Sequence, residues 1–215
     1  MTTTANFNFD SWWNFDWLAP HPNQDSELLK QIGFIPGLKE FLMLRQVHAL
    51  EHATVWVLCE MQQRRQQPSA PITLTLDNET LGGLSSEQGF YLYGQINRLD
   101  LQRAVREALQ RLKQGEWQLA VHPRCGTNLS VAMLLTAGLV ISAHLLLPRG
   151  PIEQLFGLGL AASTAVQLAP DVGMSVQKYL TTSIPFNLKV VEIVQTQDKL
   201  RHPAYFVRVD WQDLQ

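Results

Sequence analysis

The chain has 215 residues, 46% of them hydrophobic, a formal net charge of −2 and two cysteines, Cys59 and Cys125. This length supports one modest domain with a hydrophobic core and short attachments. The absence of any run of Lys or Arg argues against nucleic-acid binding, and two cysteines exclude a disulfide-based fold.

Residues 1–35 form a predicted arm with an aromatic start, in which Trp12, Trp13 and Trp17 lie close together. Tryptophan is favoured at the headgroup depth of a bilayer, so one interpretation is an interfacial anchor. Packing of the arm onto the domain explains the same residues equally well. The start of the arm has neither the basic nor the apolar region of a secretory signal peptide.

Residues 36–128 have the pattern of a small mixed domain that carries the candidate metal-binding region. After Pro36-Gly37, apolar residues at helical spacing predict a helix over residues 38–63. The polar, proline-containing residues 64–71 are typical of a loop, and the alternation in residues 72–76 predicts a strand.

Residues 82–121 of this region have the signals of two further strands and a helix. A turn is predicted at Gly82-Gly83 and a strand over residues 89–94. Asp100 is suited to cap a helix that runs to residue 114, and Gly115 is suited to end it. Residues 116–121 are predicted to form a short strand.

Residues 129–170 are predicted to form a transmembrane helical hairpin. Residues 129–147 contain no formal charge and as a helix would span about 28 Å, close to the thickness of a bilayer core. The breaker at residues 148–151 separates them from a second apolar segment, residues 152–169. Small residues four apart in this segment would let two helices approach closely (Gly157 with Ala161, and Gly159 with Ser163).

The flanks of the hairpin carry more basic residues than its loop, where Arg149 is the one cation. The positive-inside rule then places both flanks in the cytoplasm, as expected for an integral protein of the plasma or thylakoid membrane. The alternative is a hairpin buried in a soluble helical core, although core helices of this length seldom lack charge.

Residues 171–215 are predicted to complete the cytoplasmic domain with strands at 189–195 and 204–209. The predicted fold class is α+β: a small mixed domain with a long motif-bearing helix, interrupted by the transmembrane hairpin.

The helix over residues 38–63 contains the motif His48-Ala49-Leu50-Glu51-His52, which has the H-x-x-E-H spacing of an inverted zinc-protease helix. Two histidines four residues apart share one helix face with the glutamate and can bind one divalent metal. Glu51 is then placed to act as general base toward water that the metal has made acidic.

A second motif, His122-Pro123-Arg124-Cys125-Gly126-Thr127-Asn128, supplies further ligand types. A zinc site needs at least a third protein ligand, and His122 and Cys125 are the candidates. A cysteine ligand favours zinc over iron or manganese.

Each motif also has a purely structural interpretation. His48 and His52 could lie on the polar face of the helix, with Glu51 paired to Arg45 or Lys39. His122-Pro123 could be a turn, and Cys125 a small buried residue.

The two motifs, in this order and followed by two apolar segments, resemble the YqhQ-like family of bacterial membrane proteins. Residues 177–182 with Pro185 are similar to a segment that follows the hairpin in that family. Residues 45–58 and the glycine-marked segments at 82–85 and 89–94 are more similar to a smaller family of uncharacterised cyanobacterial proteins. The resemblance covers about residues 34–195, and this chain departs from the YqhQ-like pattern at Ala49-Leu50. It implies a metal-dependent membrane enzyme with no assigned reaction.

Three functional hypotheses follow. The first is a membrane-embedded zinc hydrolase, most simply a peptidase acting on a membrane protein or a lipid-like substrate, with His48, His52 and either His122 or Cys125 as ligands. The second is a membrane scaffold or assembly factor in which all four side chains close a structural zinc site and Glu51 orients a histidine. The third is a metal-free, membrane-anchored interaction protein.

Overall fold

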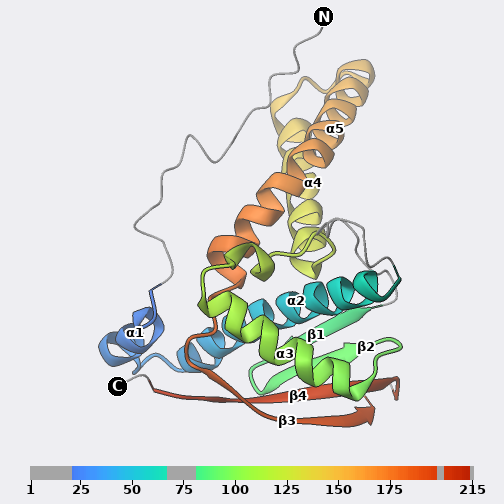
Figure 1. Ribbon diagram of the computed structural model, residues 1–215. Coiled ribbons are helices and arrows are strands. Elements are labelled where there is room, and N and C mark those ends of the chain that lie inside the picture. The colour runs from blue at the N-terminus through green and yellow to red at the C-terminus, as the bar shows by residue number, and fades with distance from the viewer. Residues whose placement is uncertain (1–20, 67–80, 198–200, 214–215) are drawn as a thin grey trace, which may run out of the picture.

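The computed structural model describes residues 21–66, 81–197 and 201–213, and these form an α+β fold from which a long helical hairpin projects (Figure 1). A four-stranded antiparallel sheet has the order β1-β2-β4-β3. Helices α2 and α3 cover one face of the sheet, and the hairpin of α4 and α5 rises beyond α2. The fold class and the helical hairpin are therefore confirmed.

Helix α2, Leu38–Gln66, confirms the predicted helix and extends it by one turn. Its central part is apolar on several faces because it is buried on several sides: Leu50, Ala53 and Val57 are fully buried in the main hydrophobic core. The helix packs against α3, β1 and the segment before α4, and this central position lets one helix present side chains to several elements.

The sheet joins segments from both sides of the hairpin. Strands β1, Gly82–Ser86, and β2, Gly89–Tyr93, form a tight hairpin. After α5 the chain returns as β3, Leu188–Gln197, and β4, Pro203–Trp211, and β4 pairs with β2. The strands predicted at 89–94, 189–195 and 204–209 are confirmed. The sheet would be incomplete without the C-terminal segment, so the hairpin is an insertion within one domain.

Helix α3, Arg98–Lys113, begins earlier than predicted. Its N-cap is Asn97, whose side chain accepts a hydrogen bond from the Leu99 amide at 2.8 Å. Asp100 instead lies in the first turn and binds Arg65, so its prediction as the cap is wrong. Gly115 follows the helix end with a φ of 106°, a conformation that favours glycine, and the predicted end is confirmed.

Two further local predictions are wrong. Gly82-Gly83 is the start of β1 and not a turn, because both residues are paired with β2. Residues 116–121 form no strand: Trp117–Ala120 is a short 3-10 helix, η3, whose buried Leu119 and Ala120 pack toward α2. A short apolar run fits either structure, and burial decides between them. The strand predicted at 72–76, and residues 1–20 of the arm, lie outside the described residues.

The described part of the arm contains a helix that was not predicted, α1, Gln24–Ile32. Its buried Asp25 accepts a hydrogen bond from Gln46 of α2, and its Ser26 accepts one from Asn187 at 2.8 Å. Gln46 also binds Asn187, at 3.2 Å. A buried polar network therefore ties α1 to α2 and to the start of β3.

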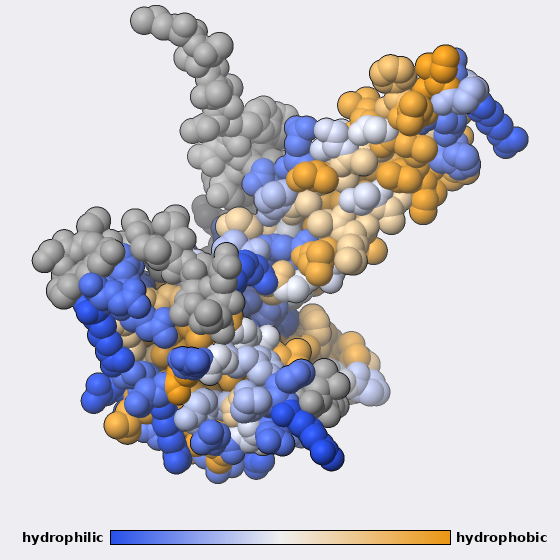
Figure 2. Space-filling model, turned by 90° about the vertical axis from the view of Figure 1, so that its right-hand side faces the viewer, coloured by the Kyte–Doolittle hydropathy of each residue, from blue (hydrophilic) through white to orange (hydrophobic). Residues whose placement is uncertain are grey.

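The projecting hairpin consists of α4, Gly126–Leu146, and α5, Pro151–Val176, which continues into a π-helical turn, η4, Gln177–Thr181. Both helices are long and apolar enough to cross a membrane. Large apolar side chains on them are exposed, including Leu146 at 83% and Phe156 at 75%, and Figure 2 shows this apolar surface running along the projection. A β-carbon at Gly157 would meet the end of the Leu147 side chain, which lies just after α4.

Candidate metal centre

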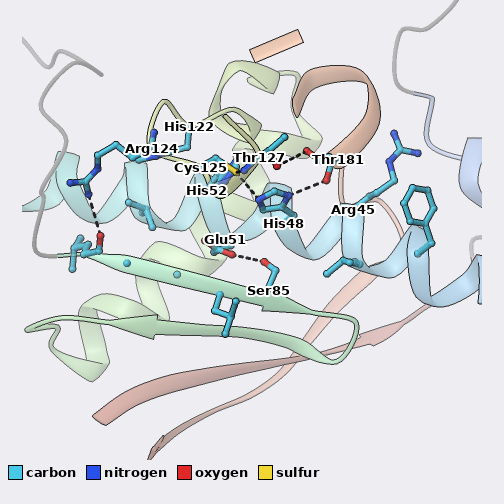
Figure 3. A pocket seen from close by; sticks show the side chains of 18 residues that line it. Arg45, His48, Glu51, His52, Ser85, His122, Arg124, Cys125, Thr127 and Thr181 are labelled. Atoms are coloured by element: carbon cyan, nitrogen blue, oxygen red, sulfur yellow. Dashed lines mark hydrogen bonds between the residues drawn. The ribbon is translucent and has the colours of Figure 1, made fainter. Parts of the chain in front are cut away.

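Two distant segments bring three metal-ligand side chains together (Figure 3). His48 and His52 come from α2, and Cys125 is the residue just before α4. One ligand atom from each of these residues lies within 4.8 Å of the other two. The site therefore lies where the hairpin joins the mixed domain.

The hydrogen bonds of the histidines fix which ring nitrogen is available as a ligand. The Nδ1 atom of His52 lies 2.7 Å from the carbonyl oxygen of Ala120, and that of His48 lies 3.0 Å from the carbonyl oxygen of Thr181. A carbonyl oxygen only accepts, so each Nδ1 carries the hydrogen, and Nε2 is the ring nitrogen that can serve as a ligand. The Nε2 atom of His48 lies 3.2 Å from the sulfur of Cys125. Histidines that bind metal are oriented in this way.

Burial keeps His52 in the form that a ligand requires. Its ring is almost completely enclosed, and the loss of solvent, together with the charge of His48, lowers the pKa of His52 well below its ordinary value. A neutral imidazole at neutral pH has a lone pair to offer.

Cys125 is the N-cap of α4, and its sulfur accepts a hydrogen bond from the Thr127 amide at 3.4 Å. Burial raises the pKa of the Cys125 thiol, and the charge of Glu51 raises it further. The protein alone thus favours the thiol, and a cation between the sulfur and the imidazoles would favour the thiolate.

Glu51 lies beside this group, between α2 and β1. Its carboxylate accepts a hydrogen bond from the Ser85 hydroxyl, in place of the ion pair with Arg45 or Lys39 that the structural interpretation expected. A side chain at Gly83 would collide with that carboxylate, so the glycine makes room for it. Burial raises the pKa of Glu51 above its ordinary value, although Ser85 and His48 oppose this. A carboxylate with a raised pKa is a better proton acceptor.

His122 lies outside the group of three. Its ring packs between those of His52 and Trp56, with centroid distances of 5.6 and 4.7 Å. Its Nδ1 accepts a hydrogen bond from the Arg124 amide at 3.3 Å. The structure thus places Cys125, rather than His122, next to His48, and the His122 ring against the rings of His52 and Trp56.

The segment that carries His122 and Cys125 is held by two amides that the sequence analysis did not single out. The side-chain oxygen of Gln177, in the π-helical turn, accepts from the His122 amide at 2.9 Å. The Gln177 nitrogen donates to Asn128 at 2.6 Å, and Asn128 donates to the Pro123 carbonyl at 2.7 Å. Both amides lie in the segments that carried the family resemblance, which was the available signal. Ser85, which was not singled out either, ends the glycine-marked segment 82–85 of the same resemblance.

A cavity of about 440 Å³ opens onto this group. Its lining combines the candidate ligands, two arginines, the first residues of β1 and a few apolar side chains (Phe41, Leu44, Arg45, His48, Glu51, His52, Val55, residues 81–85, His122, residues 124–127 and Thr181). The arrangement therefore has both a metal-ligand group and space for a substrate beside it.

The comparisons place the chain among proteins of unknown function. The model of a family described as a domain of unknown function, DUF6391, matches residues 43–193. The chain belongs to the DUF6391 family. It is 50% identical over 203 residues to an uncharacterized protein of Picosynechococcus sp. (strain PCC 7002), covering 94% of this chain and 97% of that protein. No solved structure matches. The expected similarity to uncharacterised cyanobacterial proteins is confirmed, and a relation to the YqhQ-like family stays a prediction.

Proposed function

We propose that this protein is an integral membrane, zinc-dependent hydrolase whose metal ligands are His48, His52 and Cys125. The observation that carries the proposal is the convergence of three donor atoms, within 4.8 Å of one another, in a cavity that also contains the Glu51 carboxylate. Both histidines already donate their Nδ1 hydrogens to carbonyl oxygens, which leaves Nε2 for the metal.

The donor set fits zinc. Imidazole nitrogen and cysteine thiolate are both zinc ligands, and catalytic zinc has three protein ligands and keeps a fourth position open. Ligand bonds of about 2.05 Å to nitrogen and 2.3 Å to sulfur put the two atoms about 3.6 Å apart in a tetrahedral site. The 3.2 Å between His48 Nε2 and the Cys125 sulfur is close to this, so a small outward shift accommodates the ion.

Glu51 is the proposed general base. A zinc ion held by these residues would supply Lewis acidity and make water acidic enough to lose a proton near neutral pH. Glu51 would take that proton, helped by the raised pKa that burial gives its carboxyl. Ser85 orients the carboxylate by donating a hydrogen bond to it.

The hairpin is the proposed membrane anchor. A soluble core helix would be buried, whereas Val131 is the one buried residue of α4 and the outer side chains of both helices are apolar. Cys125 precedes the first helix and Thr181 ends the continuation of the second, so the metal centre would lie at the membrane surface. The charge pattern of the flanks favours the cytoplasmic side.

A closed structural zinc site is the second candidate, and the position of the ligands on α2 and beside α4 favours it, because such an ion would clamp the hairpin to the domain. It needs a fourth ligand. His122 would have to leave its place between His52 and Trp56 to supply one. The open cavity beside the group favours the catalytic reading.

Bound metal in the detergent-purified protein tests the proposal, measured by elemental mass spectrometry on the wild type and on matched variants. We expect about one zinc per chain, lost in His48→Ala and Cys125→Ala. It should be kept in His144→Ala and Cys59→Ala, which remove the same side chains elsewhere. Glu51→Gln should keep the zinc and lose hydrolysis of ester and peptide test substrates. A folded wild type without metal would refute both zinc hypotheses. Zinc that also depends on His122, with no hydrolysis, would establish the structural site instead.

A further inference from the structure

Strand β1 lines the cavity with its edge rather than with one face. Residues 81–85 all line it, in unbroken succession. Because successive side chains of a strand point to opposite faces, a strand that presented one face would contribute every second residue. A continuous run means that the backbone itself borders the cavity.

The pairing of the sheet decides which backbone groups point into that space. The Val209 amide of β4 donates a hydrogen bond to the Gln88 carbonyl, next to the start of β2. The N–H and C=O groups of every second residue of β2, counted from Gln88, therefore point toward β4. The residues between them, such as Tyr91, point toward β1 and pair with Gly82, Leu84 and Ser86. The N–H and C=O groups of Gly83 and Ser85 therefore point away from the sheet.

This outer edge has no strand beside it among residues 21–66, 81–197 and 201–213. Gly82 and Gly83 have no side chains to shield the backbone, and another chain can approach closely there. Leu84 is 57% exposed. The edge thus offers two alternating pairs of hydrogen-bonding groups and an apolar side chain, next to the Glu51 carboxylate.

We propose that the substrate of this site is a peptide segment in extended conformation, which binds by adding a strand to the outer edge of β1. The inference rests on the proposed hydrolase function and names its substrate class. An extended peptide satisfies the edge groups of Gly83 and Ser85 with its own backbone, as in other cases of strand addition. The same contacts place its backbone carbonyls along the cavity beside Glu51 and the ligand group.

Peptide hydrolysis at this position needs water and no other reactant. The water oxygen bonds to the peptide carbonyl carbon, and Glu51 takes one of its protons. The carbon–nitrogen bond then breaks, and Glu51 returns that proton to the leaving nitrogen. The products are a carboxylic acid and an amine, which become a carboxylate and an ammonium group at neutral pH.

The first test uses the zinc-loaded full chain in detergent and a proteome-derived peptide library, with cleavage products identified by mass spectrometry. One cleaved peptide is then resynthesised with a single N-methyl group at each position in turn. Strand addition predicts that methylation lowers cleavage at least about 10-fold at alternate positions, while the intervening positions stay close to the unmodified rate. A uniform effect, or an effect confined to the cleaved bond, would overturn the strand-addition model.

A pair of variants at Ser85 tests the edge from the protein side. Ser85→Ala removes the hydroxyl that binds Glu51 and keeps the outward N–H, and Ser85→Pro removes both. Proline is tolerated where an edge N–H points outward, so zinc content and the circular dichroism spectrum should match between the two. We expect proline to reduce peptide cleavage a further 10-fold or so relative to alanine; equal rates in the two folded, zinc-loaded variants would argue against the edge.

The outcomes separate this inference from the function on which it rests. If the zinc-loaded protein hydrolyses ester or lipid test substrates in a Glu51-dependent way but cleaves no peptide, the hydrolase stands and the peptide substrate is refuted. A protein that binds no zinc and hydrolyses nothing refutes both.

Discussion

The Nδ1 atom of His52 donates a hydrogen bond to the carbonyl oxygen of Ala120, a residue 68 positions further along the chain, and the nitrogen and oxygen are 2.7 Å apart. This bond links the centre of α2 to the segment that leads into α4. It orients the His52 ring, and it anchors the start of the segment in which Cys125 follows Ala120 by five residues. One backbone carbonyl thus orients one candidate ligand and holds the segment that carries another.

Substitution of the two adjacent glycines of β1 should have unequal effects. A β-carbon at Gly83 collides with the Glu51 carboxylate, whereas one at Gly82 has its nearest neighbour at 3.9 Å, an ordinary contact. We expect Gly83→Ala to cost about 1–3 kcal/mol of unfolding free energy, the usual cost of overpacking, and Gly82→Ala to cost much less. Thermal unfolding of the two variants in the same detergent measures the difference. Equal melting temperatures would mean that Glu51 does not lie against β1.

Gln177 should support both the fold and the metal affinity. It is fully buried and binds the His122 amide and the Asn128 side chain, so Gln177→Leu leaves both without that partner. Burying unsatisfied groups costs about 1–3 kcal/mol, and loss of such support lowers metal affinity about 10-fold or more. Thermal unfolding and zinc competition with a chelator give the two quantities. Gln110→Leu, on the exposed surface of α3 and outside the hairpin, is the matched control and should change neither.

Arg111 should be the most important ion-pairing residue away from the metal centre. It donates to Glu60 at 2.8 Å and to Glu116 at 2.7 Å, and Glu60 has a side chain only 9% exposed. Arg111→Met leaves that carboxylate buried without its cation, which should cost about 3 kcal/mol. Arg65→Met breaks a pair whose arginine is 60% exposed and should leave the melting temperature almost unchanged. A similar small loss in both variants would contradict this ranking.

The Arg111–Glu116 pair should also give a defined pH dependence. Hydrogen bonds from Arg111 hold the pKa of Glu116 below its ordinary value of 4.5. A lowered folded-state pKa stabilises the protein above the unfolded pKa, and this stabilisation is lost as the pH falls through the folded value.

The measurement is the difference in stability between wild type and Glu116→Gln across pH. Because Glu116 is partly exposed, we expect a difference of less than about 1 kcal/mol at pH 7. The stability difference should shrink only below pH 4.5, where the wild type loses the stabilisation from the charged Glu116. The glutamine variant has no group that titrates at this position. A difference that stays constant down to pH 3 would show that the charge of Glu116 does not contribute.

Much of the fold could be predicted because its signals are local. The length of α2, the two apolar helices of the hairpin and the strands at 89–94, 189–195 and 204–209 follow from apolar periodicity and helix-breaking residues. The errors fell where contacts with distant segments override local preference. Gly82-Gly83 belongs to a strand because β2 pairs with it and Glu51 needs its space, and Trp117–Ala120 is helical although its residues suit a strand.

The sequence by itself determined which side chains are available for chemistry: two histidines and a glutamate on one helix face, and a histidine and a cysteine before an apolar helix. Only the tertiary structure decided that Cys125 meets His48 while His122 packs behind His52, because three residues of separation in an irregular segment leave either outcome open. It alone placed the edge of β1 beside Glu51, since strand pairing joins segments whose distance along the chain carries no information about their contact.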